Sequence, residues 1–205
     1  NVTVGDSGVT GYILDSEFGP IFGDEFQTFS GGPSMPHVYM GAANYPMYNQ
    51  QLTSSVTTNN LMIDNTISAI NSSIFDVKVI ANATRVGDSV FVNTAVEFVA
   101  ASTEHFIGVY LLEDELLGLQ NYSPLPPSQA SHDNVVRSAA ELGNPLGTTS
   151  MGPSFLAGQR VEGSYGIKVS TSGLAVNPSN LQVAVVVYKT DAVDGFSNAI
   201  LINVD

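Results

Sequence analysis

The sequence contains no cysteine, and this absence removes three kinds of chemistry at once. Without thiols, the residues shown can form no disulfide framework, no thiolate metal site and no cysteine nucleophile. Basic residues are also scarce, since 6 Lys and Arg stand against 19 Asp and Glu, for a formal net charge of −13. A surface of this sign repels phosphate groups. We therefore expect no nucleic-acid partner and no non-specific attraction to anionic lipid.

Long hydrophobic runs are absent as well. No stretch approaches the ~18 consecutive apolar residues that a membrane-spanning helix needs, so we expect no membrane-spanning segment. Only 12% of the residues are charged, and glycine, serine, threonine and asparagine are common, a mixture found more often in exported bacterial β domains. The chain opens at Asn1-Val2-Thr3 without an initiating Met, which is typical of a processed product or a fragment. We expect an exported protein, extracellular or associated with the cell surface or outer membrane.

Alternation of apolar and polar residues dominates the chain from about residue 70 onwards. Phe75 to Asn82 and Val90 to Phe98 both show this period-2 pattern, and the turn Val86-Gly87-Asp88-Ser89 between them predicts a hairpin. Further strands are predicted at Phe106 to Leu112, Arg160 to Val169, Leu181 to Tyr188 and Ser197 to Val204. The valine run within Leu181 to Tyr188 is typical of a central strand buried on both faces. The pattern predicts a mainly β fold, an antiparallel β-sandwich of about seven to nine strands.

The first part of the chain lacks this alternation. It is rich in proline and glycine, so we predict a small, irregular or α/β N-terminal segment over residues 1–57 and the β-sandwich domain over residues 58–205. A short helix is expected around Asp15 to Phe22 or around Ile63 to Ile70. Within the sandwich, the proline-rich segment Asn121 to Gln129 is expected to be a connection, because proline donates no ladder hydrogen bond.

A charged island stands out against the mostly uncharged strands. Three consecutive acids, Glu113-Asp114-Glu115, follow a predicted strand, and His132-Asp133-Asn134-Val135-Val136-Arg137 comes after the proline-rich connection. In a functional interpretation, His132 is a general base oriented by Glu113 or Asp114, and Arg137 binds an anionic substrate. In a structural interpretation, Arg137 makes bidentate hydrogen bonds to an acid of the triplet, while His132 and Asn134 tie a loop to a strand edge.

The structural interpretation is favoured by the neighbours of Arg137. Val135, Val136 and Ala139 flank it, so its stem should pack on apolar surface, and charges removed from water must be paired. No nucleophile or oxyanion-hole motif lies beside the island. We therefore predict a structural polar network here and assign no catalytic residue.

Histidine spacing argues against a metal site. Only His37, His105 and His132 are present, and no two of them are placed as metal-binding pairs usually are. No motif for a cofactor is found either, so we predict neither a metal nor a cofactor.

At the island the chain resembles the outer-membrane protein 28-related family, exported proteins of Gram-negative bacteria. In that family a strand ends in a Glu-Asp pair, like Glu113-Asp114, with a glutamine several residues on, like Gln120. A stretch similar to His132-Asp133-Asn134-Val135-Val136-Arg137 follows, then a valine-rich strand and a last strand like Asn198-Ala199-Ile200-Leu201. The resemblance spans about residues 60 to 205. It adds Gln120 to the predicted network, whose members are Glu113, Asp114, Gln120, His132, Asn134 and Arg137.

Members of that family typically carry a thioredoxin-like region before the β domain. Residues 1–55 are similar to the tail of such a region, and Met35-Pro36 resembles the proline that faces a thioredoxin active site, which implies a cis peptide bond at Pro36. The redox Cys-x-x-Cys is absent, so the chain shown has no thiol redox activity.

Three functions follow as hypotheses. The first is an exported, surface-associated structural or interaction module with a protein partner, including self-association through strand edges. The second is an envelope thiol–disulfide protein whose redox half lies upstream of Asn1. The third and weakest is a carbohydrate-binding or hydrolytic site at the charged island.

Overall fold

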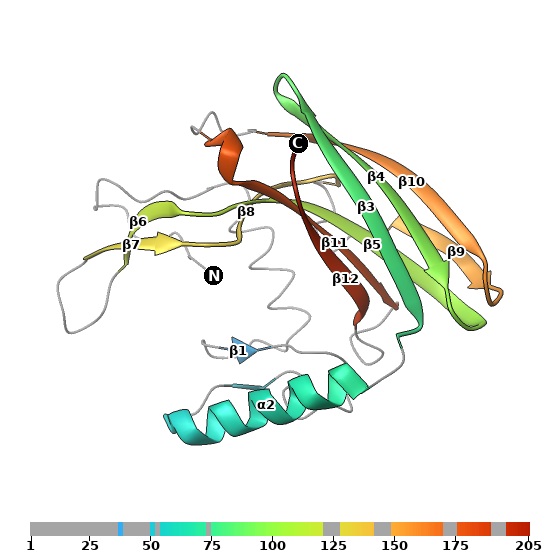
Figure 1. Cartoon of the computed structure of the whole chain (residues 1–205), viewed down its shortest axis with the longest axis horizontal. Coiled ribbons are helices and arrows are strands. Elements are labelled where there is room, and N and C mark those ends of the chain that lie inside the picture. The colour runs from blue at the N-terminus through green and yellow to red at the C-terminus, as the bar shows by residue number, and fades with distance from the viewer. Residues whose placement is uncertain are drawn as a thin grey trace.

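The computed structural model describes residues 37–38, 50–51, 54–72, 75–120, 128–141, 149–169, 176–189 and 196–205. Within them the chain is mainly β. Two antiparallel sheets face each other, one of three strands in the order β10-β4-β3 and one of five strands built around β5 (Figure 1). The predicted antiparallel β-sandwich is confirmed, and its eight strands fall within the range expected from the sequence.

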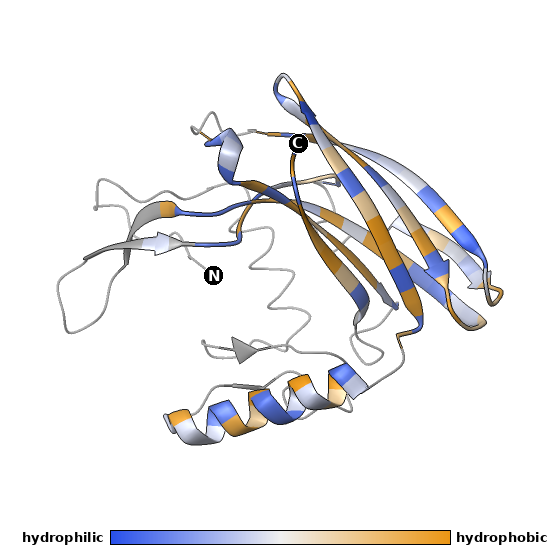
Figure 2. Ribbon diagram, viewed as in Figure 1, coloured by the Kyte–Doolittle hydropathy of each residue, from blue (hydrophilic) through white to orange (hydrophobic). Residues whose placement is uncertain are grey.

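The three-stranded sheet contains the predicted hairpin. β3 (Val77–Val86) pairs with β4 (Ser89–Phe98) across a turn at which Gly87 has a φ of 64°, a conformation that glycine adopts at little cost. β10 (Arg160–Lys168) lies on the other side of β4. The alternation read from the sequence is also the alternation of burial, because the apolar face of β4 points into the core. Hydrophobic and hydrophilic bands follow one another along β3 and β4 in Figure 2.

The five-stranded sheet is centred on β5 (Ser102–Glu113). One side of β5 pairs with β11 (Leu181–Lys189), which in turn pairs with β12 (Phe196–Asn203). The other side pairs with β9 (Thr149–Phe155) near the start of β5 and with β8 (Val135–Ala139) near its end.

Burial along β11 corrects one expectation. Val183, Val185 and Val187 are fully buried, whereas Ala184 and Val186 are only half-buried. The valine run is central in its sheet, but it faces the core on one side only. A continuous apolar run therefore did not mean burial on both faces, because successive side chains of a strand point to opposite faces of the sheet.

The core lies between the two sheets. Phe98 of β4 and Phe155 of β9 stack with their ring centroids 3.8 Å apart, linking the sheets at one end. The rest of the core is mostly valine, which suits a strand because its branched side chain packs well on a pleated surface. Its other fully buried large members include Val77, Val90, Val92, Val96, Leu111, Ile167, Val183 and Val185.

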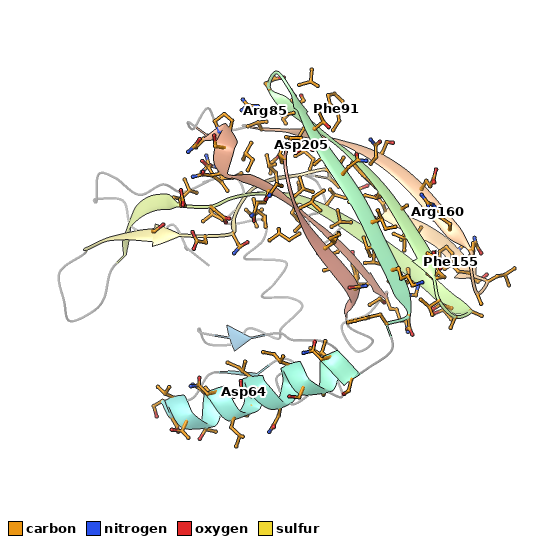
Figure 3. The ribbon with its side chains drawn as sticks, in the orientation of Figure 1. Asp64, Arg85, Phe91, Phe155, Arg160 and Asp205 are labelled. Carbon is orange, nitrogen blue, oxygen red and sulfur yellow. The ribbon has the colours of Figure 1, made fainter. Side chains whose placement is uncertain are left out.

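The two sheets are joined along β3 and the C-terminal strand. The backbone N–H of Arg85 donates to the carbonyl of Asp205 at 2.8 Å, and Asp205 N–H donates to the carbonyl of Ala83 at 3.1 Å (Figure 3). Further along, Asn198 Nδ2 donates to the carbonyl of Val77 at 2.9 Å. These bonds close one side of the sandwich, which we call the seam.

A single long helix precedes the sandwich within the described residues. α2 (Val56–Ser72) begins after Ser55, whose hydroxyl accepts a hydrogen bond from Thr58 N–H at 3.3 Å in the manner of an N-cap. The helix expected at Ile63 to Ile70 is part of α2, and the expected domain boundary between residues 57 and 58 falls in its first turn. The alternative helix at Asp15 to Phe22 lies outside the described residues. No helix among the described residues is long and apolar enough to cross a bilayer.

Two small two-stranded sheets complete the description. β1 (His37–Val38) pairs with β2 (Gln50–Gln51), and β6 (Leu116–Gln120) pairs with β7 (Ser128–His132). Ser128 and Gln129 therefore belong to a strand, which corrects the expectation that the proline-rich connection reaches Gln129. The three prolines of that connection lie within residues 121–127, outside the described residues.

Candidate functional site

The charged island is built on the ends of β5 and β8. Nε of Arg137 lies 3.2 Å from Oε2 of Glu113, and the two side chains are only 3% and 2% exposed. Oε2 has no aligned hydrogen-bond donor among the described residues, so its attraction to Arg137 is ionic. The bidentate hydrogen bonding expected from the sequence is therefore wrong, because Oε1 accepts from the backbone of Asn177 instead. An ion pair this deeply buried is costly to desolvate and is strongly coupled once formed. β5 and β8 are adjacent strands, which brings two residues 24 positions apart in the sequence into one pair.

A third segment caps the same carboxylate. Backbone N–H of Asn177 donates to Glu113 Oε1 at 2.7 Å, just before the 3₁₀ turn η1 (Pro178–Asn180). Asn180 then binds the next two acids, since its Nδ2 lies 3.2 Å from both the carbonyl of Asp114 and Oε2 of Glu115. In return, Asp114 N–H donates to the carbonyl of Asn180 at 3.0 Å. The acidic triplet is therefore held by β8 on one side and by the loop before β11 on the other.

Two aspartate side chains form hydrogen bonds at the junction between the β5–β8 strand pair and the β6–β7 strand pair. Asp114 Oδ1 accepts from Asn134 N–H at 2.7 Å, and Asp133 Oδ1 accepts from Glu115 N–H at 3.1 Å. Glu115 and Asn134 both have left-handed backbones, with φ of 57° and 55°. Residues other than glycine adopt this conformation rarely, although asparagine tolerates it better than glutamate does. The reciprocal bonds fix the angle at which the β6–β7 arm leaves the sandwich (Figure 1).

The structure brings four of the six predicted network residues together. Glu113 and Arg137 form the ion pair, and Asp114 binds the backbone of Asn134. Gln120 and His132 are placed by backbone only, in β6 and β7, and their side chains lie outside the described residues. Pro36 also lies outside them.

Sequence reasoning missed other members of the network, which are Glu115, Asp133, Asn177 and Asn180. The Asn-Pro-Ser-Asn run at residues 177–180 carries a turn signal, because asparagine before proline favours a turn. That signal did not indicate which strand end the turn would meet.

A second buried polar cluster surrounds His105 of β5. The ring is fully buried between Phe98 and Phe155, its Nδ1 lies 2.9 Å from the carbonyl of Thr103, and its Nε2 lies 3.0 Å from Oγ of Ser197. A carbonyl only accepts, so Nδ1 carries the proton and Nε2 is free to accept from the Ser197 hydroxyl.

Burial lowers the pKa of His105 below its ordinary value, because an imidazolium ion is poorly solvated in the core. The carbonyl of Thr103 and the charge of Asp76 oppose this shift, and the charge of Lys189 adds to it. The ring is therefore neutral at neutral pH, and it links β5 to β12.

The free edge of the three-stranded sheet is the third feature. β10 ends the strand order, so its outer side has no strand partner within the described residues. The backbone N–H of Phe98 donates to the carbonyl of Gln159, and the carbonyl of Phe98 accepts from the N–H of Gly158. The backbone groups of the even-numbered residues of β4 therefore point toward β10. Their register partners in β10 are the odd-numbered residues, such as Gly163 and Tyr165. The outward N–H and C=O groups therefore belong to Arg160, Glu162, Ser164, Gly166 and Lys168.

Chemically, the island and the edge differ in what they can offer. The Glu113 carboxylate and the Arg137 guanidinium are shielded from solvent and engage groups of their own chain, so a soluble anion has no open approach to them. No group of three or more His, Asp or Glu in the described part of the chain is arranged to hold a metal ion. The β10 edge, in contrast, carries backbone hydrogen-bonding groups that have no strand partner among the described residues.

Comparison with known proteins gives little sequence similarity. No family model and no curated protein matches the chain. Among solved structures, a domain of the outer membrane lipoprotein Omp28 from Porphyromonas gingivalis is similar to 65% of this chain and 91% of that one, at 17% identity and a TM-score of 0.44. The sporulation control protein Spo0M from Bacillus subtilis is similar over 64% of this chain, at 13% identity and a TM-score of 0.39. The chain spans about half the length of Spo0M, since 50% of that chain is covered. Similarities this low establish no function, so the functional interpretation rests on the residues of this chain.

Proposed function

We propose that this protein is a structural and interaction module that binds a protein partner by β-strand addition at the edge of β10. The observation that carries this proposal is the open edge itself, nine residues long, whose outward backbone groups meet no other strand among the described residues. An edge of this kind is a template for another chain, because main-chain hydrogen bonds form whatever the partner's side chains are.

The charged island has a structural role in this proposal. Its buried ion pair and its two aspartate bonds hold β5, β8, the β6–β7 arm and the loop before β11 in one arrangement. In a hydrolytic or sugar-binding site, Glu113 and Arg137 would have to be accessible, which their burial opposes. The island therefore supports the sandwich, and the binding surface lies elsewhere.

Hydrogen exchange on the dilute protein tests the open edge. We expect the outward amides of Glu162, Ser164 and Gly166 to exchange rapidly, while the inward amides of Gly163 and Tyr165 are protected by β4. Backbone amides in a paired ladder exchange only when the structure opens, whereas unpaired amides at an edge exchange directly. Equal protection of both sets would show that the chain covers its own edge, and the proposal would fail.

The location that we propose is exported and surface-associated. It is supported by the low content of charged residues, the scarcity of lysine and arginine, and the sequence resemblance at the island. Fractionation of the native cells, with detection by an antibody to this chain, tests the location. Recovery of the protein in the cytoplasmic fraction would contradict it.

A further inference from the structure

We propose that the partner at the β10 edge is a second copy of this chain, paired antiparallel so that Glu162 of each copy lies opposite the partner's Lys168. This inference rests on the proposed function, because it fills the same edge. It goes further by naming the partner and the register.

The backbone of β10 is accessible in the middle of the strand. Gly166 is exposed, and since glycine has no side chain, the exposed surface is that of its backbone. Ser164 and Lys168 on either side are exposed as well. An incoming strand can therefore reach the outward N–H and C=O groups without displacing a described side chain.

Charge selects one register for two copies of this edge. In an antiparallel pair, outward residues lie opposite outward residues. A two-fold axis beside Tyr165 places Glu162 opposite the partner's Lys168, places Ser164 opposite the partner's Gly166, and repeats both contacts by symmetry. Opposite charges facing each other across strands stabilise a pair.

One of the two neighbouring two-fold registers is disfavoured by the same rule. An axis at Ser164 would place Arg160 opposite the partner's Lys168, and like charges directly opposite each other destabilise a strand pair. Within each copy, Nη2 and Nε of Arg160 both lie 3.0 Å from Oε1 of Glu162, but this pair is on the exposed surface and contributes little to stability. A turn of Glu162 toward the partner's Lys168 therefore costs little.

The adjoining strand accommodates the same pairing. Phe91 of β4 is the register partner of Gly166 and is 51% exposed, and Asn93 is the register partner of Ser164. In the proposed register, Phe91, Gly166, the partner's Ser164 and the partner's Asn93 lie in one row across the sheet. No two like charges meet in that row, and the small residues stand at the junction. The result is a continuous six-stranded sheet shared by two sandwiches.

Sedimentation equilibrium of the full chain over a wide concentration range measures the association. We expect wild type to dimerise reversibly, and Glu162→Lys or Lys168→Glu to weaken dimerisation about tenfold, because each change places two like-charge pairs across the junction. The double variant restores the wild-type affinity. A mixture of the two single variants forms a heterodimer, since each Lys at 162 or 168 then faces a Glu.

Controls separate this inference from general charge effects. Lys78→Glu combined with Glu97→Lys exchanges an exposed pair on β3 and β4, with Nζ and Oε1 3.4 Å apart, and changes no residue of β10, so it should leave dimerisation unchanged. Circular dichroism checks that each variant is folded. Failure of the double variant and of the mixture to recover affinity would overturn the register.

Two further outcomes distinguish the inference from the proposed function. A chain that stays monomeric at the highest concentration overturns the second copy as partner, while rapid exchange of the outward amides still supports an open edge for another chain. Protected outward amides in the dilute monomer overturn both.

Discussion

At the scale of single residues, the buried charges matter most. Glu113 combines an ion pair to Arg137 with a hydrogen bond from Asn177, so one carboxylate connects three separate segments. Removing one partner of such a pair leaves an uncompensated charge in the core, which is far more costly than removing both. The losses of stability caused by substituting Glu113 and Arg137 are therefore not expected to add.

Single substitutions in this pair should be severe. We expect Arg137→Met or Glu113→Leu to lower the free energy of unfolding by about 3–5 kcal/mol, because the remaining charge is buried without its counter-ion. The double variant should cost less than the sum of the two single variants. Urea denaturation of all four proteins measures this cycle. Additive costs would mean that the two side chains are not coupled.

His105 predicts how stability depends on pH. Its pKa in the folded protein lies below the ordinary value of 6.5, so as the pH falls the unfolded state binds the proton first. Its contribution to stability is fully present above pH 6.5, and it is lost as the pH falls from there toward the folded-state pKa.

The measurement compares wild type with His105→Gln, which cannot titrate. As the pH is lowered from about 7.5 to about 5, the free energy of unfolding of wild type should fall relative to that of His105→Gln. A constant difference would mean that the ring is not shielded from protons. His37 and His132 are present in both proteins and cancel in the comparison.

At the scale of secondary-structure elements, β10 has two unlike sides. One side belongs to the sheet, and the other carries backbone groups without a strand partner in the described structure. Proline substitutions distinguish the two sides, because proline removes a backbone donor and is tolerated only where that donor is not used.

We expect Gly166→Pro to change the free energy of unfolding by less than about 1 kcal/mol, since the outward amide of Gly166 makes no ladder bond. Tyr165→Pro should cost about 3 kcal/mol or more, because the inward amide bonds to β4. Gly166→Ala is the matched control, and its Cβ would meet only Phe91 Cε1 at an ordinary 3.9 Å. Thermal and urea unfolding measure these effects. If the two proline variants were equally damaging, the assignment of inward and outward residues would be wrong.

The β6–β7 arm shows how an element is aimed by a few polar bonds. Asp114 lies between β5 and β6, and Asp133 lies between β7 and β8. The side chain of each aspartate bonds the backbone of the opposite segment. The left-handed residues Glu115 and Asn134 stand at that junction. The direction of the arm is therefore set by the hydrogen bonds of Asp114 and Asp133 together with the left-handed backbone at Glu115 and Asn134.

At the scale of the whole molecule, the sandwich is asymmetric. The seam closes one side through Asp205, Asn198 and the Lys189–Asp76 ion pair, with Nζ and Oδ2 2.9 Å apart. The β10 edge is on the other side of the three-stranded sheet. One side of this sheet is therefore joined to the second sheet, and the other has no strand partner among the described residues.

The seam predicts a difference between two asparagines of β12. Asn198→Ala should cost about 1–3 kcal/mol, because it leaves the carbonyl of the buried residue Val77 without its donor. Asn203→Ala should change stability by less than about 0.5 kcal/mol, since Asn203 is exposed and its Oδ1 accepts a long hydrogen bond, at 3.4 Å, from Nε2 of Gln182. Urea denaturation decides between them, and equal costs would mean that the seam bond does not contribute.

The local pattern of apolar and polar residues was enough to predict most strands of the sandwich. β3 and β4 were placed by alternation, and their turn by Gly87, because a half-buried strand needs one apolar face and a tight turn needs a residue that tolerates positive φ. β7, β8 and β9 were harder to predict. They are short, and Gln129, Ser138 and Gly152 interrupt any apolar run.

The sequence by itself determined the class of the fold, its overall negative charge and the need for a partner for Arg137, because composition and period-2 alternation are local properties of the chain. Only the tertiary structure decided that the partner is Glu113, that Asn177 binds Glu113 while Asn180 binds the next two acids, and that β10 is an edge. These facts depend on strand order and register, which bring together residues distant in sequence and leave no signal in the local pattern.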